Sequence, residues 1–415
     1  MHIITLVFLL ALFCSFIVQL WLIKRNLAHI QYHRSKVPEA FNDKIDLKEH
    51  QKAADYTSVK LRFSIIELIV STILLLLWTL GGGLQLLDQS MLQFSLNSPW
   101  NGVVVFLGLF LIMGIIDLPF SLYRTFKIEQ QFGFNKSTIS IFCIDLVKQT
   151  ALMLIIITPL LGIILWLMET AGQYWWLYVW LVWMSFSLLM MWAYPAFIAP
   201  IFNKFKELDD EELKVTINQL LKKCGFSNNG IYIMDGSRRS SHGNAYFTGM
   251  GNNKRIVFFD TLLESLDAKE IEAVLAHELG HFKHKHIIKH IIVMACLSLF
   301  SLALLGWLMQ FTPFYTALGV ETPSTYMALI LFLLVSPIFS IYLQPVMAYF
   351  SRKHEFEADN YASQQSDAKV LIRALVKLYK ENANTLTPDP LYSAFHDSHP
   401  PASVRIANLT PRTTG

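Results

Sequence analysis

Cysteine and charge are both scarce in this sequence. Its four cysteines, Cys14, Cys143, Cys224 and Cys296, lie far apart and form no Cys-x-x-Cys pair. This spacing argues against a disulfide framework and against a cysteine zinc cluster. Charged residues make up only 16% of the chain, with a formal net charge of +3, and no concentrated basic stretch occurs outside the segments that flank apolar runs. Because nucleic-acid binding needs such stretches, we expect no nucleic-acid partner.

Apolar side chains are abundant, at 53% of the residues. Seven apolar stretches are long enough to cross a bilayer, which takes about 20 helical residues. They lie at 3–22, 63–82, 101–122, 149–168, 174–196, 287–310 and 326–349. The sequence therefore predicts a mainly α-helical, polytopic membrane protein with seven transmembrane helices.

Lysine and arginine are distributed unevenly between the connections. They crowd into segments 23–62 and 123–148 and are absent from the connections near 83–100, 169–173 and 311–325. The positive-inside rule then predicts an N-terminus outside and a cytoplasmic C-terminus. We divide the chain into transmembrane helices one to five with their loops (1–197), a cytoplasmic catalytic segment (198–286), helices six and seven (287–349) and a C-terminal catalytic segment (350–415).

Residues 277–281, which read His-Glu-Leu-Gly-His, carry the clearest chemical signal. His277 and His281 lie four apart on one helix face, where both can bind a single metal ion. Glu278 can act as general base toward a metal-bound water. Asp267 and Glu270 predict a capping box at the start of this helix. Since such a motif also occurs in helices that bind no metal, a third ligand is required.

Residues 355–359 provide that third ligand. Glu355 and Asp359 lie four apart on one helix face. Glu355 can bind the metal while Asp359 accepts a hydrogen bond from a ligating histidine. Glu357 points elsewhere on the helix and is expected to be a solvated charge.

Three more histidines, His284, His286 and His290, follow the metal-binding helix. We expect that helix to continue into the sixth span. The three histidines then mark the cytoplasmic interface, and we do not assign them to the metal.

The polar tail adds two candidates. His399 precedes two prolines and can donate a hydrogen bond to the oxyanion of a tetrahedral intermediate. Arg405 can hold that loop, or a ligating carboxylate, by a charge-assisted bond.

The segment ahead of the metal-binding helix is predicted to hold a helix over 207–224 and then a β-hairpin. Residues 231–234 and 255–259 are typical of strands, and 244–249 lies between them with a turn at 251–253. An exposed edge strand beside a catalytic metal can bind an extended peptide by main-chain pairing. A purely structural hairpin is the alternative.

Together these stretches resemble the integral-membrane CAAX prenyl protease 1 family, zinc metallopeptidases that act on C-terminal Cys-aliphatic-aliphatic-X motifs. The matching segments are 244–249 (Asn-Ala-Tyr-Phe-Thr-Gly), 277–281, 355–359 (Glu-Phe-Glu-Ala-Asp), 399–401 (His-Pro-Pro) with Arg405, and, less specifically, 123–136 and 199–205.

The resemblance implies seven helices around a large water-filled chamber, with a site for one Zn²⁺ per chain closing its cytoplasmic side. It implies a peptide or lipidated-protein substrate and the lipid bilayer as partners. The roles it implies are zinc ligands for His277, His281 and Glu355, general base for Glu278, oxyanion donor for His399, support for Asp359 and Arg405, and substrate binding for Asn244 and Tyr246.

Two positions depart from the family pattern. His354 stands where an aromatic residue is expected, and Val404 stands where an acid is common. We expect a bacterial-type member, for which general membrane-protein quality control is an alternative task. A multi-span transporter or channel with a structural metal site is the alternative from another class; it predicts internal repeats and charges in the middle of several spans. A metal-dependent hydrolase acting on lipid is a third.

Overall fold

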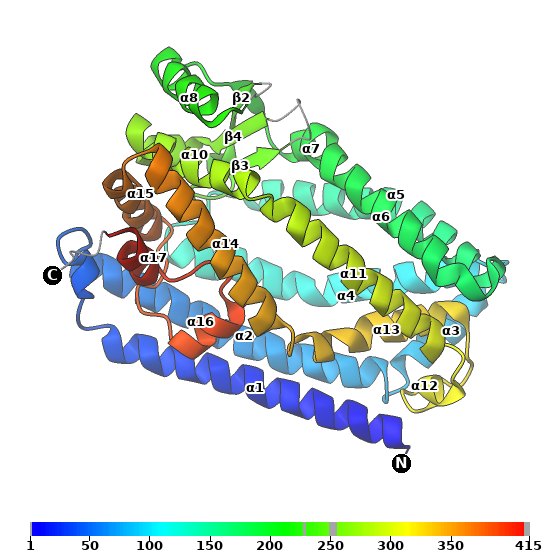
Figure 1. Ribbon diagram of the computed structural model, residues 1–415. Helices are drawn as coiled ribbons and strands as arrows, with labels where there is room; N and C mark the ends of the chain where they lie inside the picture. Colours follow the sequence, from blue (N-terminus) through cyan, green and yellow to red (C-terminus); the bar gives the residue numbers. More distant parts are fainter. Residues whose placement is uncertain (1, 227–229, 249–254, 411–415) are drawn as a thin grey trace.

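Long helices dominate the computed structural model, which describes residues 2–226, 230–248 and 255–410 (Figure 1). Within these residues six helical segments are long and apolar enough to cross a membrane, and a bent pair makes a seventh. The segments are α1 (Ile3–His33), α2 (Leu47–Trp78), α4 (Trp100–Tyr123) running into the π-helix η2 (Arg124–Glu129), α5 (Ile139–Thr170), α6 (Trp175–Ala193) with η3 (Gly172–Tyr174), η4 (Tyr194–Ile198) and α7 (Ala199–Phe202), α11 (His286–Leu308), and the pair α13 (Thr325–Ser340) and α14 (Gln344–Gln365). The predicted polytopic, mainly α-helical architecture is confirmed.

Several helices extend well beyond the apolar runs that revealed them. α2 begins at Leu47, although its apolar stretch starts only at residue 63. A capping box fixes this start: Asp46 accepts a hydrogen bond from the Glu49 amide at 2.8 Å, and Glu49 accepts one from the Asp46 amide at 3.2 Å. Hydropathy marks only the part of a helix that suits lipid, so it missed the polar half that continues outside the bilayer.

The seventh span is not the single helix predicted over 326–349. α13 ends at Ser340, α14 starts at Gln344, and the two are bent by 67°. Pro345 occupies the first turn of α14. Proline lacks the amide donor of a helix interior but suits a first turn, so it marks a new helix. The bend carries α14 toward α10 (Ala268–Lys283).

Four short strands form one mixed sheet in the order β1-β2-β4-β3. They are β1 (Phe205–Glu207), β2 (Ile231–Met234), β3 (Ala245–Thr248) and β4 (Arg255–Phe259). β1 is antiparallel to β2, β2 is parallel to β4, and β3 is antiparallel to β4. The predicted hairpin is therefore β3 with β4, and β3 is an edge strand. Its predicted turn at 251–253 lies outside the described residues. The helix predicted over 207–224 is α8 (Glu211–Cys224), preceded by β1.

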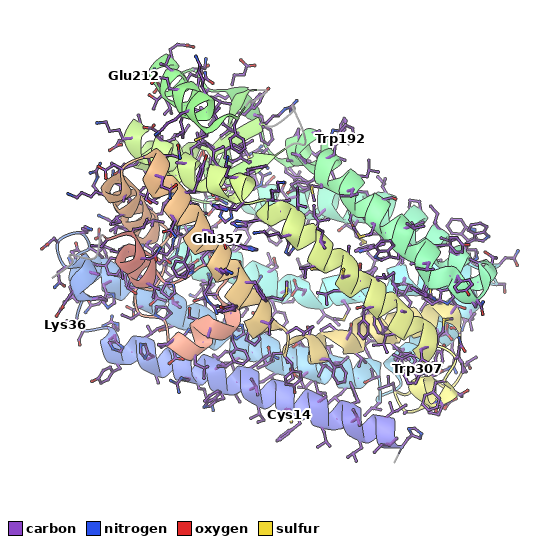
Figure 2. All side chains as sticks on the ribbon, viewed as in Figure 1. Cys14, Lys36, Trp192, Glu212, Trp307 and Glu357 are labelled. Atoms are coloured by element: carbon purple, nitrogen blue, oxygen red, sulfur yellow. The ribbon has the colours of Figure 1, made fainter. Side chains whose placement is uncertain are left out.

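The two largest hydrophobic cores lie at opposite ends of the molecule (Figure 1). One joins α8, the sheet and α10 to α9 (Asp260–Ser265), α15 (Ala368–Glu381) and α17 (Ala402–Leu409). The other joins the bundle to α3 (Gly83–Leu92) and α12 (Thr312–Thr316). Trp192 and Trp307 project outward from the bundle (Figure 2), with exposed fractions of 50% and 65%. Large apolar surfaces of this kind suit a lipid environment.

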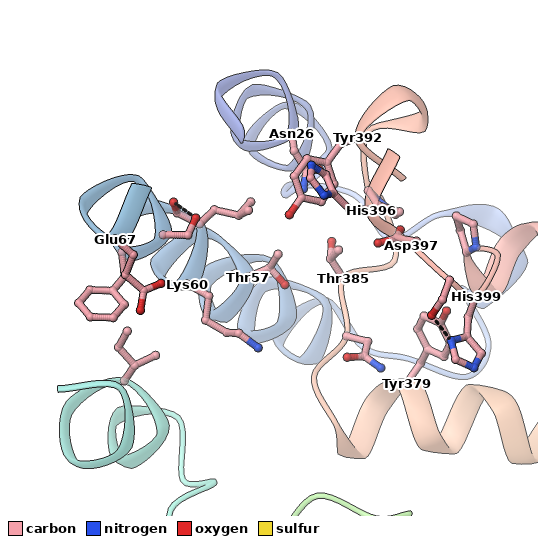
Figure 3. A pocket seen from close by; sticks show the side chains of 18 of the residues that line it. Asn26, Thr57, Lys60, Glu67, Tyr379, Thr385, Tyr392, His396, Asp397 and His399 are labelled. Carbon is pink, nitrogen blue, oxygen red and sulfur yellow. Dashed lines mark hydrogen bonds between the residues drawn. The ribbon is translucent and has the colours of Figure 1, made fainter. Parts of the chain in front are cut away.

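Three adjoining cavities of about 550, 480 and 380 Å³ lie between these cores. The first and second share Ser64 and Arg124, and the second and third share Gln19 and Met113. The first is also lined by His399, which follows α16 (Pro390–His396) (Figure 3). The bundle is thus hollow from the level of α13 up to the segment that carries His399.

Candidate metal centre

α10 carries His277, Glu278 and His281. The predicted capping box starts this helix: Asp267 accepts from the Glu270 amide at 2.9 Å, and Glu270 accepts from the Asp267 amide at 3.0 Å. Its apolar face is buried in the core that α10 shares with the sheet and α15. With one face fixed in this way, the histidine pair is turned toward α14.

α14 packs against α10 at a glycine. A Cβ added at Gly280 would lie 2.8 Å from the Cα of Ala358 and 3.0 Å from its carbonyl oxygen. Only a residue without a side chain permits this approach. Gly280 therefore lets the two helices come close enough for Glu355, one turn before Ala358, to reach the histidines.

Three candidate ligand atoms converge between these helices. The Nε2 atoms of His277 and His281 are 3.3 Å apart. Glu355 Oε2 lies 3.5 Å from His277 Nε2, and Glu355 Oε1 lies 3.3 Å from His281 Nε2. A tetrahedral ion with bonds of about 2.0–2.1 Å holds its ligands about 3.3–3.4 Å apart. The spacing therefore fits a zinc-sized cation.

The electrostatics of the cluster also favour a cation. Glu355 Oε2 is buried, and His277 Nε2 and Arg405 Nη1 each lie 3.5 Å from it, which is long for a hydrogen bond. A small cation at this point would compensate the buried carboxylate more closely. Burial disfavours protonation of His277, but hydrogen bonds to Asp359 and Glu355 outweigh it and raise its pKa to about 9. The same negative charge that retains a proton on His277 would attract a metal ion in its place.

Asp359 and Arg405 support His277 from behind. His277 Nδ1 lies 2.9 Å from Asp359 Oδ1. Arg405 donates to both Asp359 oxygens, at 2.9 Å from Nε and 2.5 Å from Nη2. All three side chains are buried. An N–H donated from Nδ1 to Asp359 leaves the Nε2 lone pair of His277 pointing at the ligand cluster.

His399 approaches the cluster from the cavity side. Its Nε2 lies 3.4 Å from Glu355 Oε1, and the Ser398 hydroxyl is 3.0 Å from its Nδ1 (Figure 3). When Ser398 donates to Nδ1, Nε2 carries the proton and can donate it toward a substrate oxygen. Arg352 Nη1 donates to the carbonyls of Ser393, Ala394 and Asp397 at 2.9–3.2 Å, which holds the preceding segment in place.

Glu278 lies beside the cluster. Its side chain is partly buried, and no hydrogen bond to it is recorded among the described residues.

Tyr246 lies on the edge strand and Asn244 immediately precedes it. Among the described residues, neither forms a hydrogen bond or ion pair with the cluster. The Phe259 amide donates to the Asn244 carbonyl at 3.0 Å. Because hydrogen-bonded pairs alternate along an antiparallel ladder, the Tyr246 main chain also faces β4, and that of Ala245 and Phe247 faces the free edge. Burial raises the pKa of Tyr246 to about 12, so its phenol remains a hydrogen-bond donor at neutral pH.

Two expectations about the surroundings of the metal were wrong. α10 does not continue into α11: it ends at Lys283, and Lys285 adopts a left-handed conformation with φ of 55°. This turn buries His286 and places its Nδ1 3.0 Å from His281 Nδ1. Glu357 is not a solvated charge, because its Oε2 lies 2.9 Å from His286 Nε2. No sequence pattern indicated this contact, because it depends on the left-handed conformation of Lys285.

A histidine pair and a carboxylate aimed at one point, beside an edge strand and a hollow bundle, define a membrane-embedded metallopeptidase. Comparison with known proteins agrees. Residues 26–204 match the model described as "CAAX prenyl protease N-terminal, five membrane helices", and residues 207–413 match "Peptidase family M48". The chain belongs to the CAAX prenyl protease 1 type of peptidase family M48.

Individual relatives extend over most of the chain. This chain is 34% identical to CAAX prenyl protease 1 of Saccharomyces cerevisiae, over 92% of this chain and 91% of that protein. It is 41% identical to a CAAX prenyl protease 1 homolog of Arabidopsis thaliana, over 70% and 69%. The crystal structure of S. mikatae Ste24p superposes with a TM-score of 0.91 at 31% identity, covering 98% of each chain. These relatives give no support to a bacterial-type member.

Proposed function

We propose that this protein is a zinc endopeptidase that cleaves a peptide bond near the C-terminus of prenylated CaaX-type proteins. The observation that carries the proposal is the 3.3–3.5 Å spacing of the His277, His281 and Glu355 ligand atoms, in a chain whose relatives are named CAAX prenyl proteases. The family match favours peptide hydrolysis over the transporter and lipid-hydrolase alternatives.

The residues around the cluster divide the chemistry between them. Bound zinc would supply Lewis acidity, polarising the scissile carbonyl and lowering the pKa of its water to roughly 7. Glu278 takes the proton from the attacking water and returns it to the leaving amine. His399 donates from Nε2 to the developing oxyanion. Asp359 and Arg405 keep His277 in the tautomer that offers Nε2.

The substrate binds as an added strand on β3. The Ala245 carbonyl and the outward main-chain groups of Phe247 pair with an extended peptide, which positions the scissile bond independently of the substrate side chains. The Ala245 amide donates to Asn244 Oδ1 at 2.8 Å, so Asn244 must release it for a further pair. Asn244 and Tyr246 contribute side-chain contacts at the same edge. The cavities that adjoin His399 would receive the lipid tail, which explains why the site is fused to a hollow bundle.

The metal centre faces the cytoplasm in this proposal. The positive-inside rule, applied to the basic segments 23–62 and 123–148, supports an N-terminus outside, with the catalytic segments and the C-terminus inside. Prenylated C-termini presented on the cytoplasmic leaflet would then meet the site directly. A protease added to sealed, oriented vesicles should remove a C-terminal tag only when the cytoplasmic face is outward.

The direct test compares a farnesylated CaaX peptide with the same peptide unmodified, with and without a chelator. Farnesylated peptide should be cleaved faster, and the chelator should abolish cleavage of both. Equal cleavage of the two peptides would instead support a general quality-control protease.

Glu278→Gln provides the matched control. It keeps the side-chain volume but removes the base, so the variant should bind one zinc ion and fail to cleave. Turnover near the wild-type rate in this variant would refute the mechanism.

A further inference from the structure

His281 is contacted from behind by a side chain of another helix. The left-handed turn at Lys285 directs His286, the first residue of α11, back toward α10. His286 is only 5% exposed, and its Nδ1 lies 3.0 Å from His281 Nδ1. Its other ring nitrogen, Nε2, lies 2.9 Å from Glu357 Oε2 on α14. Figure 2 labels Glu357 on α14.

The contacts link His281, His286 and Glu357 in a row. One arrangement of protons satisfies every hydrogen bond in this row. The Nε2 of His281 faces Glu355 and His277, so its lone pair belongs to the metal, and the ring proton must sit on Nδ1. Nδ1–H donates to His286 Nδ1, which in turn leaves the His286 proton on Nε2. That N–H donates to Glu357. Every donor in the row meets an acceptor, with neutral rings throughout.

Glu357 cannot reach His281 without this intermediary. Residues two apart on a helix point in different directions, so Glu357 faces away from the side of α14 that carries Glu355 and Asp359. His286 bridges the difference, because it enters from α11. α14 thus anchors both histidine ligands: Asp359 contacts His277 directly, and Glu357 acts on His281 through His286.

The ring of His286 is held by its neighbours. His354 stacks on it with centroids 4.0 Å apart and planes 14° apart, and His284 stacks at 5.6 Å and 15°. Lys289 Nζ lies 3.8 Å from Glu357 Oε2, which keeps the carboxylate near the row. His354 stands where an aromatic residue was expected from the family pattern. Its imidazole is also a flat ring, so it makes the stacking contact on His286 that an aromatic residue would make at this position.

We propose that His286 and Glu357 are positioning residues that fix the orientation and proton of the metal ligand His281. The inference rests on the proposed zinc site and extends it. Partners of ligating histidines typically change metal affinity about 10–100-fold when removed. The row should therefore act on how tightly zinc is held rather than on proton transfer to substrate.

The test uses the full chain in detergent with four variants. H286F removes the hydrogen bonds but keeps a stacking ring, and E357L removes the acceptor. H286Q can place an amide oxygen toward His281 and an amide N–H toward Glu357. It therefore preserves the donor-to-acceptor direction of both hydrogen bonds. H290F is the control, because His290 is an exposed histidine of the same helix.

Zinc affinity is measured by chelator competition, and ligand geometry by the visible absorption of the cobalt-substituted protein. H286F and E357L should bind zinc about 10–100-fold more weakly, with altered cobalt bands and melting near wild type in excess zinc. H286Q should recover most of the affinity, and H290F should match wild type. Either H286F or E357L with unchanged affinity and cobalt spectrum would overturn the proposal. Wild-type protein that binds no zinc would instead refute the proposed function.

Discussion

Replacing Gly280 with alanine introduces a methyl group at the closest approach of α10 and α14. The added Cβ would lie 2.8 Å from Ala358 Cα and 3.0 Å from its carbonyl oxygen. Carbon atoms in contact normally lie about 3.5–4.0 Å apart, so the helices must separate by about 1 Å. Because both atoms belong to the α14 backbone, no side-chain rotation can relieve the clash.

The effect at the metal should exceed the effect on folding. Overpacking of this kind costs about 1–3 kcal/mol, which a large bundle can tolerate. Metal sites, however, tolerate changes of only about 0.2 Å in ligand distance. His281 adjoins Gly280, and Glu355 lies one turn before Ala358, so separation of the helices pulls ligands apart. We expect G280A to remain folded, to bind zinc weakly, and to lose about 100-fold in kcat/KM, the scale of a 1 Å misplacement.

Gly114 supplies the matched control. It also lies within a helix, α4, but a Cβ added there meets no described atom within 4 Å. G114A should be neutral or slightly stabilising, since alanine favours a helix more than glycine does. Melting temperature, zinc stoichiometry and peptide cleavage are measured for both. If G280A binds zinc and cleaves as well as G114A, Gly280 does not set the spacing of the ligand helices.

Three further outcomes follow from the geometry. His399→Ala should lower kcat about 10²–10³-fold with little change in KM, because an oxyanion donor acts in the transition state; substrate titration checks this, and an unchanged kcat contradicts the role. Arg405→Met should cost about 3–5 kcal/mol, because the buried Asp359 loses both guanidinium hydrogen bonds and keeps only its contact with His277; this is seen as a lower melting temperature that D359N in the same chain partly restores. Zinc must displace the proton that His277 retains below its pKa of about 9, so apparent zinc affinity should fall up to tenfold per pH unit below that pKa; affinity independent of pH between 6 and 8 would contradict this.

The elements that local signals specify were predicted well. The capping residues Asp267 and Glu270 start α10 where expected, and the four-residue spacings place His277 with His281 and Glu355 with Asp359 on common faces. These patterns depend only on helical periodicity. Apolar runs likewise located the membrane helices, since crossing a bilayer requires them.

The missed features depend on contacts between distant segments or on backbone turns without a sequence signal. Lys285 adopts a positive φ although lysine seldom does so, and this conformation alone places His286 behind His281. Glu357 on α14 then pairs with His286 on α11. Asp145 also forms a contact that no local pattern indicates, because it pairs at 2.7 Å with Arg239, far along the chain. The pairing of β1 with β2 likewise joins segments that are separated by α8, so it could not be predicted from local sequence.

The 67° bend between α13 and α14 separates the bilayer from the metal. α13 has 16 residues and spans about 24 Å, less than the roughly 30 Å of a hydrocarbon core. A helix shorter than the hydrocarbon core is accommodated by local thinning of the bilayer rather than by tilting. Because the bend separates α13 from α14, lipid adjustment around α13 need not shift α14 along α10, and catalysis should depend only weakly on lipid chain length.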